Sequence, residues 1–221
     1  GPPRAASRPL AGSVVGVCVR TSEPVPQESC LTILQQGGSG RDAASSPAAA
    51  LTVVAPRGQG FGSDAVCILW DGEELHGLKA SGRAPAAWSP ERFPDGMVQH
   101  GWDSVTVPGA VSAWVELSEK FGKLGLATVL APAIRYAEEG FIVSPVIARL
   151  WEKGAEVLGK EPGFAECFMP GGRRPRAGGR VRNPGAARPQ RLIARPNGRA
   201  RHEGGVGGGS GPGAPTASAE A

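Results

Sequence analysis

The sequence lacks both a long apolar run and a closely spaced pair of cysteines. No stretch reaches the ~18–20 apolar residues that a membrane-spanning helix needs, so we expect no membrane span. The opening segment, GPPRAASRPLAGSVVGVCVR, has too short an apolar core to predict a signal peptide, and the sequence indicates no particular compartment. Cys18, Cys30, Cys67 and Cys167 form no CxxC pair, which favours free thiols; a disulfide or metal role is the alternative.

Residues for metal, cofactor or acid–base chemistry are also sparse. His76 and His100 have no ligand partner at the spacing of known metal sites, so no metal is expected. GQGFGS at 58–63 does not match a dinucleotide fingerprint and predicts a turn, so no cofactor is expected. Glu138 and Glu139 stand at a predicted helix end, where solvated carboxylates are more typical than a catalytic pair.

Glycine and proline are abundant but unevenly distributed. The chain has 34 glycines and 21 prolines among its 221 residues, and the segment EGGVGGGSGPGAPTASAEA closes it. Such a low-complexity segment cannot bury enough apolar surface to offset the entropy of the chain. We therefore expect an N-terminal extension over residues 1–13, a globular region over 14–195 and a disordered Gly/Pro/Ala-rich tail over 196–221.

A strongly basic segment precedes this tail. Residues 171–201 contain ten arginines and no acidic residue. Arginine clusters bind phosphate without sequence specificity, so a nucleic-acid-binding module is one alternative interpretation, and a structural or interaction module is another. Because no aromatic residue is interleaved to stack on bases, we expect a solvated basic segment and no nucleic-acid partner.

The first half of the globular region predicts strands and helices in alternation. GSVVGVCVR at 12–20 has the length of one strand, and AVCILWDGEELHGLKAS at 65–81 is typical of a β-hairpin with its turn at Asp71-Gly72. Between them, residues 24–38 predict a short amphipathic helix. The alanine-rich stretch 41–56 predicts a helix that begins or kinks at Pro47, because an internal proline costs ~3 kcal/mol.

Three helices are predicted after a proline-containing surface loop at 81–104. The first begins at Pro108, and the second begins near Pro132 and stops at Gly140. The third follows Ser144, an N-cap residue that precedes a proline. Clear start and stop signals with broad apolar faces indicate packed scaffold.

Several stretches resemble a known family. GLKASGRAPAAWSPERF, GWDSVTVPGAVSAWVELSEKFGKLGLATVLAPAIRYAEEGFIVSPVIARLW and PGFAECFMPGG look like the large-subunit region of the gamma-glutamyltransferase (gamma-glutamyltranspeptidase) family. The resemblance extends over residues 14–195. It implies an α+β fold, the large-subunit part of the four-layer αββα sandwich of N-terminal-nucleophile hydrolases. Without the small-subunit strands, sheet edges and apolar faces should be exposed.

The resemblance also implies a chemistry and a partner. Family members are made as one precursor that cleaves itself, and the new N-terminal threonine of the small subunit attacks a γ-glutamyl amide, usually of glutathione. No threonine of this chain precedes a Thr or His; they are Thr21, Thr32, Thr52, Thr106, Thr128 and Thr216. We therefore expect a large-subunit fragment without a catalytic residue, inactive alone, that needs a small-subunit-like chain and a γ-glutamyl small-molecule donor. Family members are often exported.

One residue is predicted to bind substrate. The resemblance gives Arg83, in SGRAP, the role of gripping the donor's α-carboxylate, which a guanidinium suits because it offers two parallel donors. The family pattern places this arginine two residues further from the Ala-Pro, where this sequence has Ser81. A second departure is Ser45-Ser46-Pro47, which interrupts a helix that is alanine-rich in the family.

Overall fold

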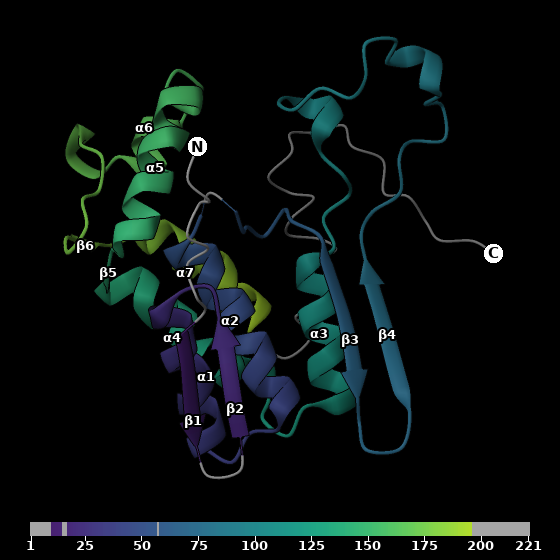
Figure 1. Ribbon diagram of the computed structural model, residues 1–221, viewed down its shortest axis with the longest axis vertical. Coiled ribbons are helices and arrows are strands. Elements are labelled where there is room, and N and C mark those ends of the chain that lie inside the picture. Colours follow the sequence, from purple (N-terminus) through teal and green to yellow (C-terminus); the bar gives the residue numbers. More distant parts are fainter. Residues whose placement is uncertain (1–9, 15–16, 57, 196–221) are drawn as a thin grey trace, which may run out of the picture.

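The computed structural model describes residues 10–14, 17–56 and 58–195, and helices form its centre (Figure 1). The predicted tail at 196–221 lies outside the described residues, and the domain boundaries stay a prediction. Four helices pack in series: α1 (Pro24–Gln35), α2 (Gly40–Val54), α4 (Leu126–Glu139) and α7 (Pro184–Ile193). The others are α3 (Ala110–Phe121), α5 (Pro145–Leu158) and α6 (Phe164–Phe168).

The described strands form three separate antiparallel pairs. β1 (Leu10–Val14) pairs with β2 (Val17–Thr21), β3 (Ala65–Trp70) with β4 (Leu75–Ala80), and β5 (Phe141–Ile142) with β6 (Arg180–Val181). The single strand predicted over 12–20 is therefore wrong. Two paired halves satisfy each other's backbone N–H and C=O groups, which one unpaired strand does not. The hairpin predicted over 65–81 is confirmed, with Trp70 opposite Leu75 across the turn.

The core lies between α2 and α4, where alanines allow close approach. Ala49 and Ala50 of α2 and Ala133 and Ala137 of α4 are fully buried. Larger side chains of α4 and of the surrounding elements close this layer, among them Val111, Trp114, Leu130, Tyr136, Ile147, Trp151 and Ile193. Burial of this apolar surface, at about 25 cal/mol per Å², is the main force that holds the helices together.

Two helices run through a proline near which the sequence predicts a helix start or, for Pro47, a start or a kink. α2 begins at Gly40, after Ser39 and Asp42 form a capping box, and runs through Pro47. α4 begins at Leu126 and runs through the buried Pro132. The burial of the alanine-rich faces outweighs the missing N–H of each proline. The start predicted near Pro132 is therefore wrong, and α2 does not start at Pro47; the alternative of a kink at Pro47 stays a prediction.

Replacement of Pro47 by alanine should stabilise the protein. Pro47 lacks the N–H that would bond to the carbonyl of Ala43, and its ring crowds that carbonyl. We expect Pro47→Ala to raise the free energy of unfolding by about 1–3 kcal/mol, measured by urea titration. Pro24→Ala is the control, because a proline at the first helical position removes no hydrogen bond. Equal effects of the two changes would contradict this assignment.

Other predicted boundaries hold to within two residues. The Ser144 hydroxyl accepts a hydrogen bond from the Ile147 N–H at 3.1 Å, which makes it the N-cap of α5. Gly140 ends α4 with a φ of +96°. α3 begins at Ala110, two residues after the predicted Pro108, because the Ser63 carbonyl accepts the N–H groups of both Gly109 and Ala110.

The basic segment folds in part, contrary to its expected solvation. α7 lies within it and buries Ala187, Gln190 and Ile193. The Gln190 Nε2 donates to the Thr52 hydroxyl of α2 at 3.3 Å. Arg191 forms an ion pair at 2.7 Å with Glu138, a carboxylate that was expected to be solvated. The low apolar content of this segment did not predict a helix, because α7 buries only one narrow apolar stripe.

The β3–β4 hairpin has one covered face and one bare face. α3 lies against its inner face (Figure 1). On the outer face, Val66, Ile68, Trp70 and Leu75 are 72%, 76%, 61% and 68% exposed. This agrees with the expectation of exposed apolar sheet faces. None of the described helices is long and apolar enough to cross a membrane.

Candidate functional site

Arg83 lies in a long loop between β4 and α3. The loop, residues 81–109, extends past the open end of the β3–β4 hairpin and away from the helical centre (Figure 1). Two single turns of 3-10 helix interrupt it, at Pro90–Arg92 and Trp102–Ser104. Loops of this length are uncommon in compact domains and are usually functional. We call it the Arg83 loop.

Asp64 fastens the two ends of the Arg83 loop together. Its Oδ2 accepts a hydrogen bond from the Ser81 hydroxyl at 3.0 Å, and its Oδ1 accepts one from the Thr106 hydroxyl at 2.6 Å. One carboxylate next to β3 thus holds the start and the end of the loop. Sequence reasoning missed Asp64, because its partners are 17 and 42 positions away along the chain.

Two glycines allow the ends of the loop to come close. A Cβ on Gly82 would lie 2.4 Å from the Val107 carbonyl oxygen, and a Cβ on Gly109 would lie 2.0 Å from the Ala80 carbonyl oxygen. Distances this short exclude any side chain unless the backbone moves. Gly82 directly precedes Arg83. The close approach of the two loop ends therefore fixes the backbone position from which the Arg83 side chain extends.

Removal of the Asp64 carboxylate should loosen the Arg83 loop. A hydrogen bond to a charged group contributes less where solvent reaches it, and both bonds of Asp64 are exposed. Asp64→Ala should therefore increase opening of the loop roughly three- to tenfold. We expect correspondingly faster cleavage within residues 81–109 by a low dose of protease. Asp95→Ala is the matched control, since that loop carboxylate makes no hydrogen bond among the described residues. Equal cleavage rates in both variants would refute the fastening role.

Aromatic contacts and an ion pair connect residues in the middle of the Arg83 loop. Arg92 lies over the rings of Trp88 and Phe93, at 5.2 and 5.7 Å from their centroids, and those rings meet edge to face at 5.4 Å. The same guanidinium donates to both carboxylate oxygens of Asp103, at 3.1 and 3.2 Å. These contacts join the two arms of the loop across its middle.

A cavity of about 310 Å³ lies inside the loop, and Arg83 is one of its lining residues. Its wall is largely apolar and includes Pro85, Trp88, Phe93, Met97 and Val105. Arg83 itself is exposed and forms no ion pair or hydrogen bond within the described part of the chain. A free guanidinium beside an apolar wall suits a ligand that carries a carboxylate and an apolar or extended remainder.

The hydroxyls of two threonines on helices serve local structure, whereas the Thr106 hydroxyl donates to the Asp64 carboxylate at 2.6 Å. Those of Thr32 and Thr52 donate to the carbonyls of Glu28 and Ala49, at 2.9 and 2.7 Å. A threonine nucleophile needs a neighbouring base to take its proton, and a backbone carbonyl does not supply one. Thr216 lies outside the described residues, so the expected lack of a catalytic residue stays a prediction.

His76 has acidic neighbours that its sequence spacing did not reveal. The hairpin brings its Nε2 to 2.6 Å from Asp71 Oδ2 and 3.5 Å from Glu74 Oε1. Hydrogen bonds from the Glu74 N–H, the His76 ring and the Glu73 N–H hold the pKa of Asp71 well below its usual range. The expectation of no nearby ligand group is therefore corrected. These groups pair with one another at the exposed turn, which accounts for them without a cation.

Cys30 and Cys67 are free thiols, and neither shows the features of a reactive cysteine. Cys30 is buried, and this burial raises the pKa of its thiol to about 11. A thiol with so high a pKa stays protonated and is a poor nucleophile. Cys67 is free and half-buried on the β3–β4 hairpin. Both observations agree with the expected free thiols.

Sequence comparison places the chain in a family. The gamma-glutamyltranspeptidase family model matches residues 28–208, and the chain belongs to this family. The oxamate amidohydrolase proenzyme of Klebsiella pneumoniae is 34% identical over 76% of this chain and 33% of its own length. The glutathione hydrolase-like YwrD proenzyme of Bacillus subtilis is 35% identical over 78% of this chain and 34% of its own length. The comparisons give no support to a nucleic-acid-binding or structural module.

A solved structure shows the same fold. The cephalosporin acylase from Bacillus halodurans has a TM-score of 0.77 and is 41% identical, over 84% of this chain and 37% of its own. The fold therefore corresponds to part of an N-terminal-nucleophile hydrolase, as the sequence resemblance implied. The chain spans about a third of the length of these relatives, several of which are proenzymes.

Proposed function

We propose that this chain forms the carboxylate-binding wall of an amide hydrolase or acyltransferase that acts on γ-glutamyl amides of the glutathione type. The observation that supports this most is the free guanidinium of Arg83 on an apolar cavity, in a loop that Asp64 and Gly82 fix at its base. Glutathione and oxamate, the compounds that name two of the relatives, both combine an amide with a nearby carboxylate. Arg83 would bind that carboxylate and so position the amide.

The attacking hydroxyl would come from a nucleophile-bearing part that this sequence does not include. In an N-terminal-nucleophile hydrolase, an N-terminal threonine attacks the amide carbon and its own α-amine takes the proton. The acyl group then passes from the threonine to water or to an acceptor amine. The role of Arg83 would be to hold the donor so that its amide carbon faces the threonine, which removes orientational freedom before the reaction.

We propose that the nucleophile-bearing part packs on the bare face of the β3–β4 hairpin. A two-stranded hairpin is at best marginally stable in water by itself, and its exposed Val66, Ile68, Trp70 and Leu75 form one apolar row. Such rows on soluble proteins mark interaction surfaces.

A reconstitution assay tests the proposal. The purified chain is mixed with the part of the Bacillus halodurans cephalosporin acylase that it does not match, and amine release from a γ-glutamyl anilide is followed by absorbance. We expect no release by either part alone and release by the mixture. Ile68→Ser with Trp70→Ser should prevent reconstitution, while Lys79→Ser on the same face should not. Turnover by the chain alone would overturn the proposal.

A further inference from the structure

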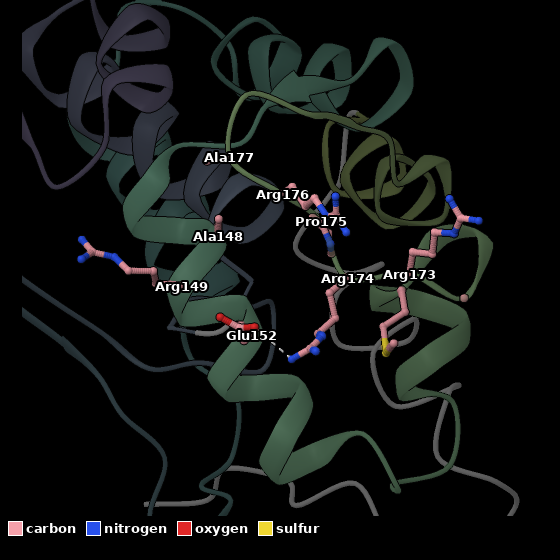
Figure 2. A pocket seen from close by; sticks show the side chains of 10 residues that line it. Ala148, Arg149, Glu152, Arg173, Arg174, Pro175, Arg176 and Ala177 are labelled. Atoms are coloured by element: carbon pink, nitrogen blue, oxygen red, sulfur yellow. Dashed lines mark hydrogen bonds and ion pairs between the residues drawn. The ribbon is translucent and has the colours of Figure 1, made fainter.

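A second, strongly basic pocket lies far from the Arg83 loop along the chain. It has a volume of about 770 Å³ and is formed by the first two turns of α5 and the segment 169–177. Arg149, Arg173, Arg174 and Arg176 line it, and Glu152 is its only acidic lining residue. Without Arg149, whose side chain extends away from the other arginines (Figure 2), three positive charges and one negative charge leave a net charge of +2 around the pocket.

Most of this positive charge is not neutralised by the protein. Arg174 Nη1 lies 3.2 Å from Glu152 Oε1, so these two residues pair across the pocket (Figure 2). Arg173 and Arg176 rise from the same segment as Arg174, whereas Arg149 extends from α5 away from that segment (Figure 2). Within the described residues, none of these other three arginines has an acidic partner.

Both ends of the arginine-bearing segment are fixed to the body of the protein. Before it, the Trp151 Nε1–H donates to the Phe168 carbonyl at 2.8 Å. After it, the Gly178 N–H donates to the Val143 carbonyl, and the Val143 N–H to the Gly179 carbonyl, both at 2.9 Å. The guanidiniums are thus carried by a wall that is already formed, which reduces the entropy lost when a ligand binds.

We propose that this pocket binds a small anion with a diphosphate group. Guanidinium forks match the oxygens of phosphate, and several of them around one cavity favour a ligand with more than one negative charge. The volume exceeds what a single phosphate fills. No aromatic residue lines the pocket, so it offers no surface on which a nucleobase would stack. The pocket therefore matches the diphosphate group of a ligand and offers no contact specific to the rest of it. This site is independent of the function proposed for Arg83.

Calorimetric titration of the chain with pyrophosphate tests the site without any need for enzymatic activity. We expect saturable binding that Arg174→Ala and Arg176→Ala each weaken roughly tenfold, since a hydrogen bond to a charged group contributes about 1.5–3 kcal/mol. Glu152→Gln should strengthen binding, because it frees Arg174 from its competing carboxylate. Arg188→Ala, an exposed arginine of α7 outside the pocket, should leave the affinity unchanged.

Competition by other anions, at constant ionic strength, identifies the ligand class. Chloride and single-stranded oligonucleotide should displace pyrophosphate poorly, and citrate less well than tripolyphosphate. Equal affinity in the wild-type chain and in the Arg174 and Arg176 variants would overturn the proposal. So would oligonucleotide binding that matches pyrophosphate binding in strength and is equally reduced by Arg188→Ala, because that pattern indicates general attraction of polyanions to the basic segment.

Discussion

Arg83→Ala should lower kcat/KM for a γ-glutamyl donor about a hundredfold in the reconstituted enzyme. Truncation of one partner of a hydrogen-bonded charge pair costs about 2–5 kcal/mol, and each 1.4 kcal/mol is a factor of ten. Part of the loss should appear in KM, because the carboxylate is already bound in the ground state, and part in kcat, because the amide is no longer oriented toward the threonine. Steady-state kinetics with a γ-glutamyl anilide provide the measurement.

Two further variants separate recognition of the carboxylate from a general effect of charge. Arg83→Lys keeps the charge but loses the parallel donors, so its kcat/KM should lie between those of the wild type and Arg83→Ala. Arg195→Ala removes one exposed charge at the end of the described chain and should change little. If donors with and without the α-carboxylate lose activity equally in Arg83→Ala, Arg83 does not bind that carboxylate.

Asp42→Ala should destabilise the fold by about 3 kcal/mol, because it removes a buried acceptor that serves several donors. Asp42 is only 1% exposed. Its Oδ2 accepts hydrogen bonds from the Ser39 N–H and hydroxyl, at 2.8 and 2.7 Å, and from the Lys123 N–H at 2.8 Å. The change therefore uncaps α2 and also detaches it from the turn between α3 and α4. Urea denaturation measures the loss, with the exposed Asp95→Ala as control.

The contribution of Asp42 should depend on pH. Burial alone would raise the pKa of its carboxyl, but hydrogen bonds from the Lys123 N–H and from the Ser39 hydroxyl and N–H hold that pKa below its ordinary value. The folded state therefore favours the ionised form. Its stabilisation is complete above the unfolded pKa of about 4 and is lost as the pH falls through the folded pKa. The difference in unfolding free energy between wild type and Asp42→Asn should shrink below about pH 4. A difference that stays constant into the acidic range would contradict this account.

Local signals were sufficient for those parts of the fold that depend on local chemistry. The hairpin turn, the Ser144 cap and the Gly140 stop all follow from residues within a few positions of one another. Pro47 and Pro132 misled the sequence analysis because the cost of one absent hydrogen bond is local, whereas the burial that outweighs it comes from distant helices.

The candidate site was predictable only at one residue. Arg83 came from the family resemblance, and no spacing rule connects it to Asp64 or Asp103. These residues meet through a loop whose ends are brought together by the fold. The basic pocket was equally hidden, because the sequence shows ten arginines without indicating which of them face a cavity.

The position of the covalent intermediate tests most directly whether this chain recognises the donor while another part attacks it. The reconstituted enzyme is incubated with a γ-glutamyl donor and quenched in acid, and its peptides are examined by mass spectrometry. We predict a γ-glutamyl group on the N-terminal threonine of the nucleophile-bearing part and none on residues 1–221. A γ-glutamyl ester or thioester on a Thr, Ser or Cys of this chain would contradict the account.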